Sequence, residues 1–424
     1  MTLPGAPYVT YRRGELHIED CSAEALAERF ATPVYVYSRA GMLHALSAYQ
    51  RALAGRDHLI CYAMKANSSL AVVQTFAQAG CGFDIVSGGE LERVLAAGGD
   101  AAKVLFSGVG KTRAELLRAL EAGVLGFNVE SEPELELLSQ VAVASGRTAR
   151  ISLRVNPDVD AQTHPYISTG LRDNKFGVAH ERVVETYQRA ASLPGLEVVG
   201  IGCHIGSQIT EITPYLDALE RVLDLVEAIE ARGVPIHHLD LGGGLGITYT
   251  DERPPSADVL VGTLLARIDA RGHGNRKILL EPGRSLVGNA GVLLSSVLYL
   301  KPGEHKNFCI VDAAMNDLVR PAMYDAWMDI VACKPADVPP SLYDVVGPVC
   351  ESGDWLGRDR ALSVRTGDRI AVLSAGAYAM SMASNYNSRG RAAEVMVSGG
   401  DAFLIRDREQ AADLFRHEHL FPKP

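Results

Sequence analysis

The chain has 424 residues, a formal net charge of −10, 47% hydrophobic residues and 22% charged residues. This composition excludes an intrinsically disordered chain, and the length predicts two domains or one large barrel with an appendage. The acidic balance argues against a nucleic-acid partner, because nucleic-acid surfaces require clustered Lys and Arg.

Cysteine spacing and hydropathy predict where the protein resides. The seven cysteines form no CxxC pair, which argues against a zinc site, and their odd, irregular set is typical of a reducing compartment. The longest uncharged apolar stretch, Ser285–Leu300, is shorter than a membrane span, and Met1–Gly14 lacks a signal-peptide core. We therefore expect a soluble, cytoplasmic protein with no metal and no membrane partner.

Between residues 58 and 283, short apolar strands alternate with amphipathic helices. Such alternation implies right-handed βαβ units, and eight of them match a closed (β/α)8 barrel. An open doubly wound sheet is the alternative, but the first strand lacks the glycine-rich turn that such folds carry. The predicted strands are Leu59–Met64, Phe83–Val86, Val104–Phe106, Gly126–Val129, Ile151–Val155, Val198–His204, His238–Leu241 and Ile278–Leu280. The predicted helices are Glu90–Ala97, Arg113–Ala122, Glu132–Ser145, Glu181–Ser192, Pro214–Arg232 and Ser256–Arg271.

After about residue 286 the pattern changes to strands separated by Pro/Gly turns, which predicts an all-β domain resembling a sandwich or barrel. Tyr8–Ile18 also has the pattern of a short strand pair that joins this domain. We therefore assign residues 33–285 to the barrel and 286–424 to the β domain, with 1–32 contributing. The predicted strands are Val292–Leu300, Phe308–Asp312, Leu342–Val346, Arg369–Leu373, Glu394–Ser398 and Ala402–Arg406.

Polar residues recur at the carboxyl ends of the predicted barrel strands, where barrel enzymes build their active sites. One polar strand end is unremarkable, but repetition around the ring favours a ligand site. These residues are Lys65, Asp84, Ser107, Asn128, Glu130, Arg154, Asn156, His204, Asp240 and Glu281.

Lys65 is the most informative of them, because it follows an apolar run and a buried amine is costly unless it is used. A desolvated lysine loses its proton readily and forms a Schiff base with an aldehyde cofactor. The alternative is a lysine whose aliphatic stem lies along the strand end while its amine reaches water.

Three further segments suggest how a cofactor would be held. Gly242–Gly246 would let backbone amides approach a phosphate, or would form a tight turn. Glu281 could pair with a protonated pyridine nitrogen and Arg284 with a carboxylate, or the two could form a structural ion pair. His204 could stack on a flat ring, with Ser207 reaching phosphate, although a lone histidine is more often structural.

Cys350 is followed directly by Glu351 among turn residues of the β domain. An exposed thiol there could serve as an acid or a nucleophile, whereas a buried free cysteine would have no such role. Spacing alone leaves both interpretations open.

Together these motifs resemble the fold-type III pyridoxal-phosphate decarboxylases, which combine a barrel of the alanine-racemase type with a β domain. The likeness runs from Thr32 to Arg389, and the motifs around Asp312–Tyr324 and Cys350 resemble the diaminopimelate branch rather than the ornithine branch. The motifs, in order, are YAMKAN, FDIVSGGE, HIGSQ, the triple glycine, EPGR, GPVCESGD and GAY.

The resemblance implies pyridoxal 5'-phosphate as cofactor and decarboxylation of meso-diaminopimelate to lysine and CO2, the last step of lysine biosynthesis, by a homodimer. Lys65 would hold the cofactor, His204 would stack on it, and Glu281 would pair with its ring nitrogen. Cys350 would protonate the product carbon and would come, with Glu351, from the second subunit. Asp84, Ser207, Gly243, Gly244, Gly283, Arg284 and Tyr378 would surround the cofactor, and Arg284, Arg320, Tyr324, Glu351 and Tyr378 would bind the substrate.

Three alternatives remain at this stage. An amino-acid racemase should place a cation, rather than Glu281, beside the ring nitrogen. A cofactor carrier without enzymatic activity would need neither the β domain nor the Cys350–Glu351 pair. A related decarboxylase of lysine, ornithine or arginine would leave one of the substrate-binding arginines unpaired, which disfavours it.

Overall fold

The computed structural model describes residues 2–159 and 175–422, which form two compact units. The barrel unit comprises Leu43–Ile247 and Glu252–Leu286, and the β unit comprises Met1–Met42, Thr248–Asp251 and Val287–Pro424. Residues 33–42, which the sequence analysis assigns to the barrel, thus belong to the β unit by their contacts.

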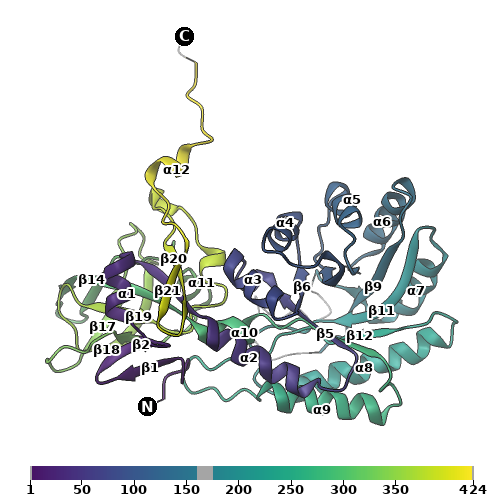
Figure 1. The fold of residues 1–424 in the computed structure, drawn as a ribbon, viewed down its shortest axis with the longest axis horizontal. Helices are drawn as coiled ribbons and strands as arrows, with labels where there is room; N and C mark the ends of the chain where they lie inside the picture. Colours follow the sequence, from purple (N-terminus) through teal and green to yellow (C-terminus); the bar gives the residue numbers. More distant parts are fainter. Residues whose placement is uncertain (1, 160–174, 423–424) are drawn as a thin grey trace. The chain divides into compact units, whose positions relative to one another are not determined.

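The barrel unit contains a closed ring of eight parallel strands, in the order β9-β11-β12-β13-β5-β6-β7-β8 and back to β9 (Figure 1). This confirms the predicted barrel, since all eight predicted strands take part; the two-residue β10 (Val178–Ala179) adds to the outside of β9. The ring strands are β5 (His58–Ala63), β6 (Gly82–Ile85), β7 (Val104–Phe106), β8 (Gly126–Val129), β9 (Ala149–Asn156), β11 (Leu196–Cys203), β12 (His238–Asp240) and β13 (Lys277–Leu280).

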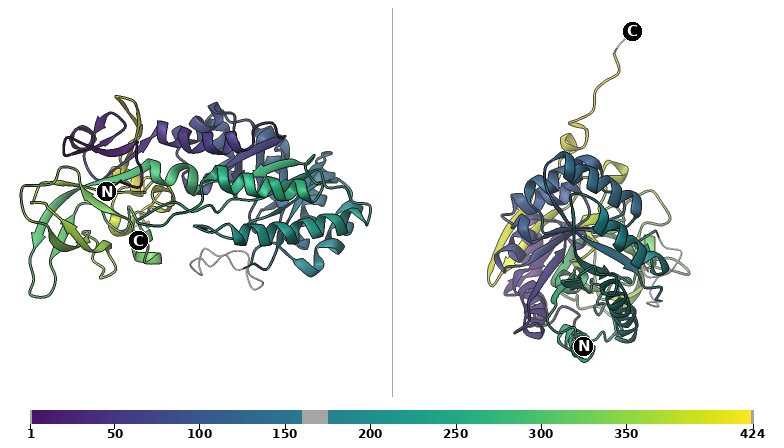
Figure 2. Two further views of the ribbon diagram at one scale, coloured as in Figure 1. Left: turned by 90° about the horizontal axis from the view of Figure 1, so that it is seen from below. Right: turned by 90° about the vertical axis from the view of Figure 1, so that its right-hand side faces the viewer.

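Helices form the outer layer of the barrel unit, as Figure 2 shows. Their starts follow local chemistry: the Thr112 hydroxyl and the Glu115 carboxylate cap each other's backbone amides at the start of α5. Inside the ring, the apolar side chains of Cys61, Leu105 and Leu279 pack together. The helices are α2 (Arg39–Ala52), which begins in the β unit, α3 (Leu70–Gln78), α4 (Gly88–Ala96), α5 (Arg113–Ala122), α6 (Glu132–Ala144), α7 (Val183–Ser192), α8 (Thr213–Glu230) and α9 (Ala257–Ala270).

The β unit is built on a mixed sheet in the order β18-β17-β15-β14-β4-β20-β21, with β19 pairing to β14 and to β16. A second, three-stranded sheet packs its apolar residues into the same core as β4, β14 and β20. The strands are β1 (Val9–Arg12), β2 (Glu15–Ile18), β3 (Cys21–Ser22), β4 (Val34–Ser38), β14 (Gly291–Lys301), β15 (Phe308–Val311), β16 (Ile330–Ala332), β17 (Ser341–Val346), β18 (Trp355–Leu362), β19 (Arg369–Val372), β20 (Ala393–Ser398) and β21 (Asp401–Arg406). Short helices are α1 (Ala23–Phe30), α10 (Arg284–Val287, at the junction), α11 (Arg320–Tyr324) and α12 (Ala411–Phe415).

The six strands predicted for this domain and the Tyr8–Ile18 pair are all present, but four strands, β3, β4, β16 and β18, were not predicted. The most consequential is β4, whose five residues are all buried between β14, which runs antiparallel to it, and β20, which runs parallel. The strand β18 was missed because its Arg358-Asp359-Arg360 run looks like an exposed turn.

No helix within residues 2–159 and 175–422 is long and apolar enough to cross a membrane.

Candidate active site

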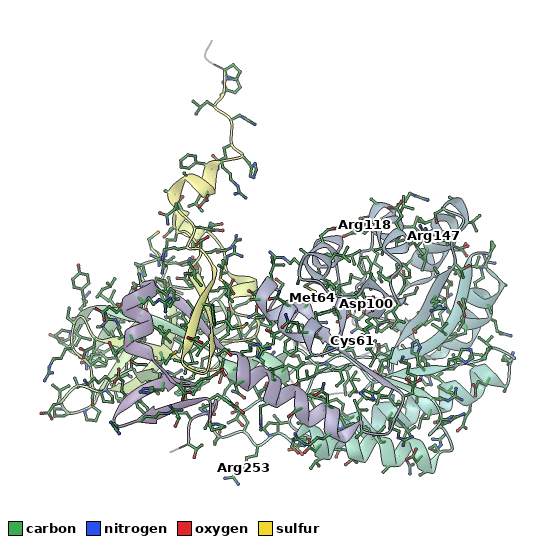
Figure 3. The ribbon with its side chains drawn as sticks, in the orientation of Figure 1. Cys61, Met64, Asp100, Arg118, Arg147 and Arg253 are labelled. Atoms are coloured by element: carbon green, nitrogen blue, oxygen red, sulfur yellow. The ribbon has the colours of Figure 1, made fainter. Side chains whose placement is uncertain are left out.

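Lys65 lies on a single 3₁₀ turn, Met64–Ala66, immediately after β5. Figure 3 labels its neighbour Met64 and, on the strand, Cys61. The Lys65 amine donates to the Asp84 carboxylate at the end of β6, with Nζ 2.6 Å from Oδ2. Asp84 is buried, whereas 37% of the Lys65 side chain is exposed, so the predicted buried lysine is in fact accessible. The pair therefore presents an amine that a ligand can reach and that a buried carboxylate orients.

A second buried cluster joins Asn128, at the end of β8, to Asp240 and Glu281. The Asn128 amide donates to Asp240 Oδ2 at 3.2 Å and to Glu281 Oε1 at 3.1 Å. Burial raises the pKa of Glu281 well above its usual range, and the nearby Asp240 and Asp84 carboxylates raise it further. Burial likewise raises the pKa of Asp240. A hydrogen bond between the two carboxyl groups raises the pKa of Glu281 further and partly offsets the rise in the pKa of Asp240.

His204 follows β11, and its imidazole is held in one tautomer. The Gly243 N–H donates to His204 Nδ1 at 3.2 Å, so this nitrogen must be unprotonated. Burial, together with the Arg154 and Lys65 cations, lowers the pKa of His204 well below its usual range. The residue therefore presents a flat, neutral ring beside the glycine loop.

The triple glycine fits where no larger residue would. A Cβ on Gly243 would lie 2.1 Å from the Glu281 carbonyl oxygen, and one on Gly244 would lie 2.3 Å from the Gly206 carbonyl oxygen. Gly244 also has φ of +99°, which side-chain-bearing residues rarely adopt. The loop thus packs directly against the segments that carry His204 and Glu281.

Arg284 and Ser207 are brought together at the same rim. The buried Arg284 guanidinium donates from Nη2 to the Ser207 hydroxyl at 3.0 Å. Gly283, just before Arg284, would bring a Cβ to 3.1 Å from both Ala63 and Ala66, on either side of Lys65. A guanidinium beside a hydroxyl is a suitable site for a phosphate or a carboxylate.

A charged network supports these groups from β8 and β9. Arg154 donates to Glu130 at 3.2 Å and to the His204 carbonyl at 3.4 Å. The fully buried Lys111 amine donates to Glu134 at 2.6 Å and to the carbonyls of Gly108 and Asn128 at 2.8 Å. Strand-end position identified Arg154 and Glu130, but the sequence analysis missed Lys111, whose Gly-Val-Gly-Lys-Thr context looks like an exposed turn.

In the β unit, Cys350 is an exposed free thiol, so the interpretation as a buried cysteine is wrong. Its backbone N–H and its Sγ both approach the side-chain oxygen of Asn387, at 3.2 Å and 3.4 Å. Glu351 is also exposed, and a hydrogen bond to it raises the pKa of the Tyr386 phenol. Asn387 was not predicted as a site residue, although it lies in a segment that carries the family resemblance.

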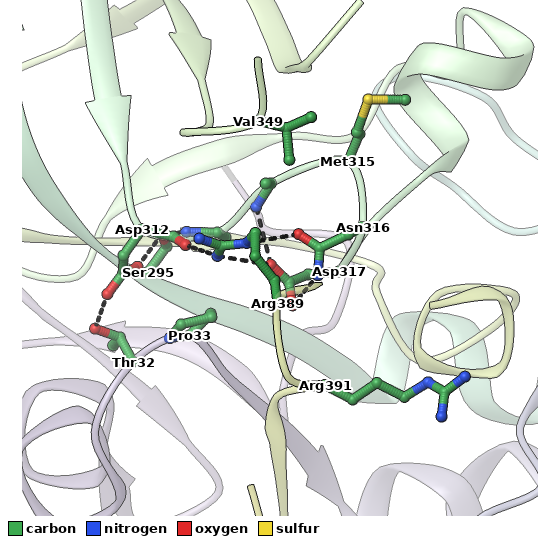
Figure 4. Close-up of polar contacts among 12 residues, drawn as sticks. Thr32, Pro33, Ser295, Asp312, Met315, Asn316, Asp317, Val349, Arg389 and Arg391 are labelled. Atoms are coloured by element: carbon green, nitrogen blue, oxygen red, sulfur yellow. Dashed lines mark hydrogen bonds and ion pairs between the residues drawn. The ribbon is translucent and has the colours of Figure 1, made fainter. Parts of the chain in front are cut away.

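The half-buried Arg389 and the buried Asp354 hold this corner of the β unit together (Figure 4). Arg389 donates to Asn316 Oδ1 at 2.8 Å and to the Asp312 carbonyl at 2.5 Å. Asp354 accepts from the Met315 and Val349 amides, each at 2.7 Å. The segments that carry Asp312 to Asp317, Val349 to Asp354, and Arg389 therefore contact one another through buried or half-buried polar groups.

The other predicted substrate residues also lie in the β unit. Arg320 is buried at the start of α11, with its guanidinium 5.3 Å from the centre of the Tyr324 ring. Tyr378 is partly exposed and has φ of +54°, a conformation uncommon for a tyrosine. Within each unit, then, the predicted residues are either clustered or placed on ordered segments.

Comparisons with known proteins agree with this geometry. Residues 39–288 match the family described as "Pyridoxal-dependent decarboxylase, pyridoxal binding domain". The chain is 58% identical to a diaminopimelate decarboxylase of Pseudomonas aeruginosa, covering 98% of this chain and 99% of that protein. It is 53% identical to one of Vibrio cholerae, covering 98% and 100%. A solved diaminopimelate decarboxylase of M. jannaschii in co-complex with L-lysine superimposes with a TM-score of 0.94 at 38% identity, covering 99% of each chain. The chain therefore belongs to the diaminopimelate decarboxylases, within the pyridoxal-dependent decarboxylase family.

Proposed function

We propose that this protein converts meso-2,6-diaminopimelate to L-lysine and CO2 with pyridoxal 5'-phosphate as its cofactor. The observation that carries the proposal is the reachable Lys65 amine, held 2.6 Å from the buried Asp84 on the rim of a barrel that belongs to this family. The names of the relatives support diaminopimelate as the substrate. With that substrate, the reaction is the final step of lysine biosynthesis.

The residues of the barrel unit fit this cofactor. Lys65 would hold it through the amine, and the neutral His204 ring would stack on it. Arg284 with Ser207 would bind the phosphate, next to Gly243 and Gly244. Two buried oxygens, Asp84 Oδ1 and Asn128 Oδ1, have no hydrogen-bond partner in the described part of the chain, as expected where a polar ligand belongs.

Glu281 would contact the ring nitrogen. Its carboxyl group is buried and its pKa is raised well above the usual range, so it can hold a proton at that nitrogen. When bound, the cofactor supplies an electron sink for the pair left by the departing carboxylate. A glutamate at this position supports decarboxylation over racemisation, which is better served by a cation there.

The chain's own residues complete the reaction. The bond between Cα and the carboxylate breaks and CO2 leaves. The Cys350 thiol then donates one proton to Cα, and a proton from solvent replaces it on the sulfur. The exposed Cys350 and Glu351 support their insertion into a second chain, and we propose a homodimer with shared active sites. Seven free thiols support a reducing, cytoplasmic location.

Substrate choice would rest on charge at the distal end. Arg320, with Arg284, would bind a distal carboxylate, while Glu351 would bind a distal ammonium, and Tyr324 and Tyr378 would contact the chain between them. Lysine or ornithine would leave a buried arginine unpaired, which weakens their binding.

The test is CO2 release from a panel of meso-diaminopimelate, its L,L isomer, lysine, ornithine and arginine. We expect the meso isomer to have the highest kcat/KM by at least about a hundredfold. Arg320→Met should reduce that preference by raising KM for the meso isomer more than for lysine. Faster turnover of lysine, ornithine or arginine would instead support the related basic amino-acid decarboxylases.

A further inference from the structure

The buried Asn128 side chain reaches from one side of the barrel to the other. In the ring order, β8, which carries Asn128, lies four strands away from β13, which Glu281 follows, and three from β12, which ends at Asp240. One amide nitrogen nevertheless lies 3.1 Å from Glu281 Oε1 and 3.2 Å from Asp240 Oδ2. The amide therefore crosses the barrel interior and connects opposite strands just below the Lys65 rim.

Only one orientation of this amide is compatible with its surroundings. Carboxylates accept hydrogen bonds, so the amide nitrogen must face Asp240 and Glu281, and a reversed amide would place three acceptor oxygens together. The orientation leaves the buried Asn128 Oδ1 with no hydrogen-bond partner in the described chain. An unsatisfied buried acceptor is destabilising, which is more readily explained by a functional constraint than by a structural one.

Neighbouring groups fix both ends of this contact. Lys111 donates to the backbone carbonyl of Asn128 at 2.8 Å, and Ser107 Oγ accepts from the same amide nitrogen at 3.1 Å. On the far side, Asp240 Oδ1 accepts from the Gly242 N–H at 2.9 Å. Glu281 is thus held by an amide whose own position is fixed, while Asp240 is fixed to the glycine loop.

We propose that Asn128 is a positioning residue, which keeps the Glu281 carboxyl group directed toward the ring nitrogen of the cofactor by donating to it and to Asp240. This inference rests on the proposed function, because it assumes that Glu281 contacts that nitrogen. Burial of Asp240 and Glu281 makes an ordered donor necessary, since two buried carboxyl groups would otherwise turn toward other partners.

The experiment measures equilibrium binding of two probes to protein from which cofactor has been removed. One probe is pyridoxal 5'-phosphate, and the other is its 1-deaza analogue, in which a C–H replaces the ring nitrogen. The ratio of the two affinities isolates the contact at the nitrogen, because phosphate and aldehyde contacts are common to both. We expect the wild-type protein to favour the nitrogen-containing probe.

Asn128→Ala should reduce this ratio by about tenfold, because Glu281 loses the donor that directs it, while binding of the deaza analogue changes little. Asn128→Leu fills the volume of the asparagine side chain better than alanine does, and it should reduce the affinity ratio to the same extent. This variant replaces Asn128→Ala in the experiment if the alanine variant unfolds. Asn307→Ala, in the β unit, is the matched control, since it removes an asparagine amide that donates to a backbone carbonyl away from the site, and it should leave the ratio unchanged.

Equal losses for both probes, or an unchanged ratio in both Asn128 variants, would overturn the inference while leaving the proposed function intact. A wild-type protein that binds both probes equally would overturn the contact between Glu281 and the nitrogen, and the inference with it. The measurement uses no substrate, so failure of the proposed substrate specificity is detected separately.

Discussion

In the barrel unit the candidate residues are mostly buried and bonded to one another, whereas in the β unit Cys350, Glu351 and Asn387 are exposed. Asp84, Asp240 and Glu281 lie at strand ends, where eight strands fix the backbone on every side. The exposed residues lie instead on turns, which the half-buried Arg389 and the buried Asp354 anchor from beneath.

The difference in burial suits the candidate residues of the two units to different tasks. Buried charges keep a fixed geometry and shifted pKa values, which suits a site that binds a cofactor and controls its protonation. An exposed thiol and carboxylate on an anchored turn suit groups that must be delivered to a site elsewhere. The comparison therefore predicts different consequences for substitutions in the two units.

The largest expected effect contrasts Lys65 with Cys350. Lys65→Ala should abolish both retention of the cofactor through gel filtration and CO2 release, because it removes the attaching amine. Cys350→Ala should retain the cofactor while turnover falls, since only proton delivery is lost. Absorbance and CO2 assays measure both. Mixed dimers of the two variants should recover part of the activity. Full turnover by Lys65→Ala would contradict the different roles assigned to the two units.

A stability contrast comes next. Lys111→Met leaves Glu134 as an uncompensated buried charge, and we expect the free energy of unfolding to fall by about 3–5 kcal/mol. Arg12→Met, which removes the exposed partner of the exposed Asp20 in the β unit, should change stability little. Urea unfolding followed by circular dichroism measures both. Similar losses would show that burial does not distinguish the two pairs.

Lowering the pH should change the free energy of unfolding in opposite directions through one buried group in each unit. Burial lowers the pKa of His238, in the barrel, to about 4, so its contribution to stability is present above pH 6.5 and is lost as the pH falls toward 4. Burial raises the pKa of Asp317, in the β unit, to about 6, so stability is gained as the pH falls from 6 to 4. Each effect amounts to about 3 kcal/mol.

Variants separate these two contributions. His238→Gln should make the free energy of unfolding fall less steeply between pH 6.5 and 4, whereas Asp317→Asn should make it fall more steeply. Denaturant unfolding at several pH values measures the slopes. Slopes that change in the same direction for both variants would contradict the opposite pKa shifts.

The sequence predicts the barrel and its rim because alternation and strand ends are local patterns. Lys65, Asp84 and Glu281 were identifiable since the carboxyl ends of parallel strands meet at one edge. The Asn128 contact was not, because closure of the ring joins residues 112 and 153 positions apart. The strand β4 was missed for the same reason: five buried residues do not reveal partners near Leu293 and Val395.

Lys111 shows a different limit. Its neighbours are turn residues, yet its side chain is fully buried, and two of its three hydrogen-bond acceptors, Asn128 and Glu134, come from other segments. Hydrophobic periodicity in the sequence does not reveal this burial, because the burial depends on how the loop after β7 folds back over β8. The assigned roles of the site residues also stay predictions until they are tested by substitution.

The smallest expected effect concerns Asn387 and the thiol of Cys350. The Cys350 N–H donates to the Asn387 side-chain oxygen, so the amide must present its oxygen, and the S–H can only donate to it. This contact holds the S–H toward the amide oxygen. Asn387→Ala should therefore speed alkylation of Cys350 by iodoacetamide about twofold at neutral pH, because the sulfur is freed to meet the reagent, and Asn387→Asp should slow it, because a carboxylate beside the sulfur repels a second negative charge.

Cys350 is the one exposed cysteine of the seven, all of which lie in the described chain, so mass spectrometry of its peptide reports this site cleanly. Ser388→Ala, at the adjacent exposed position, is the matched control and should leave the rate unchanged. Shifts in the same direction for both Asn387 variants would indicate a general loosening of the turn. Opposite shifts would show that one hydrogen bond controls the reactivity of the thiol even among the exposed residues of the β unit.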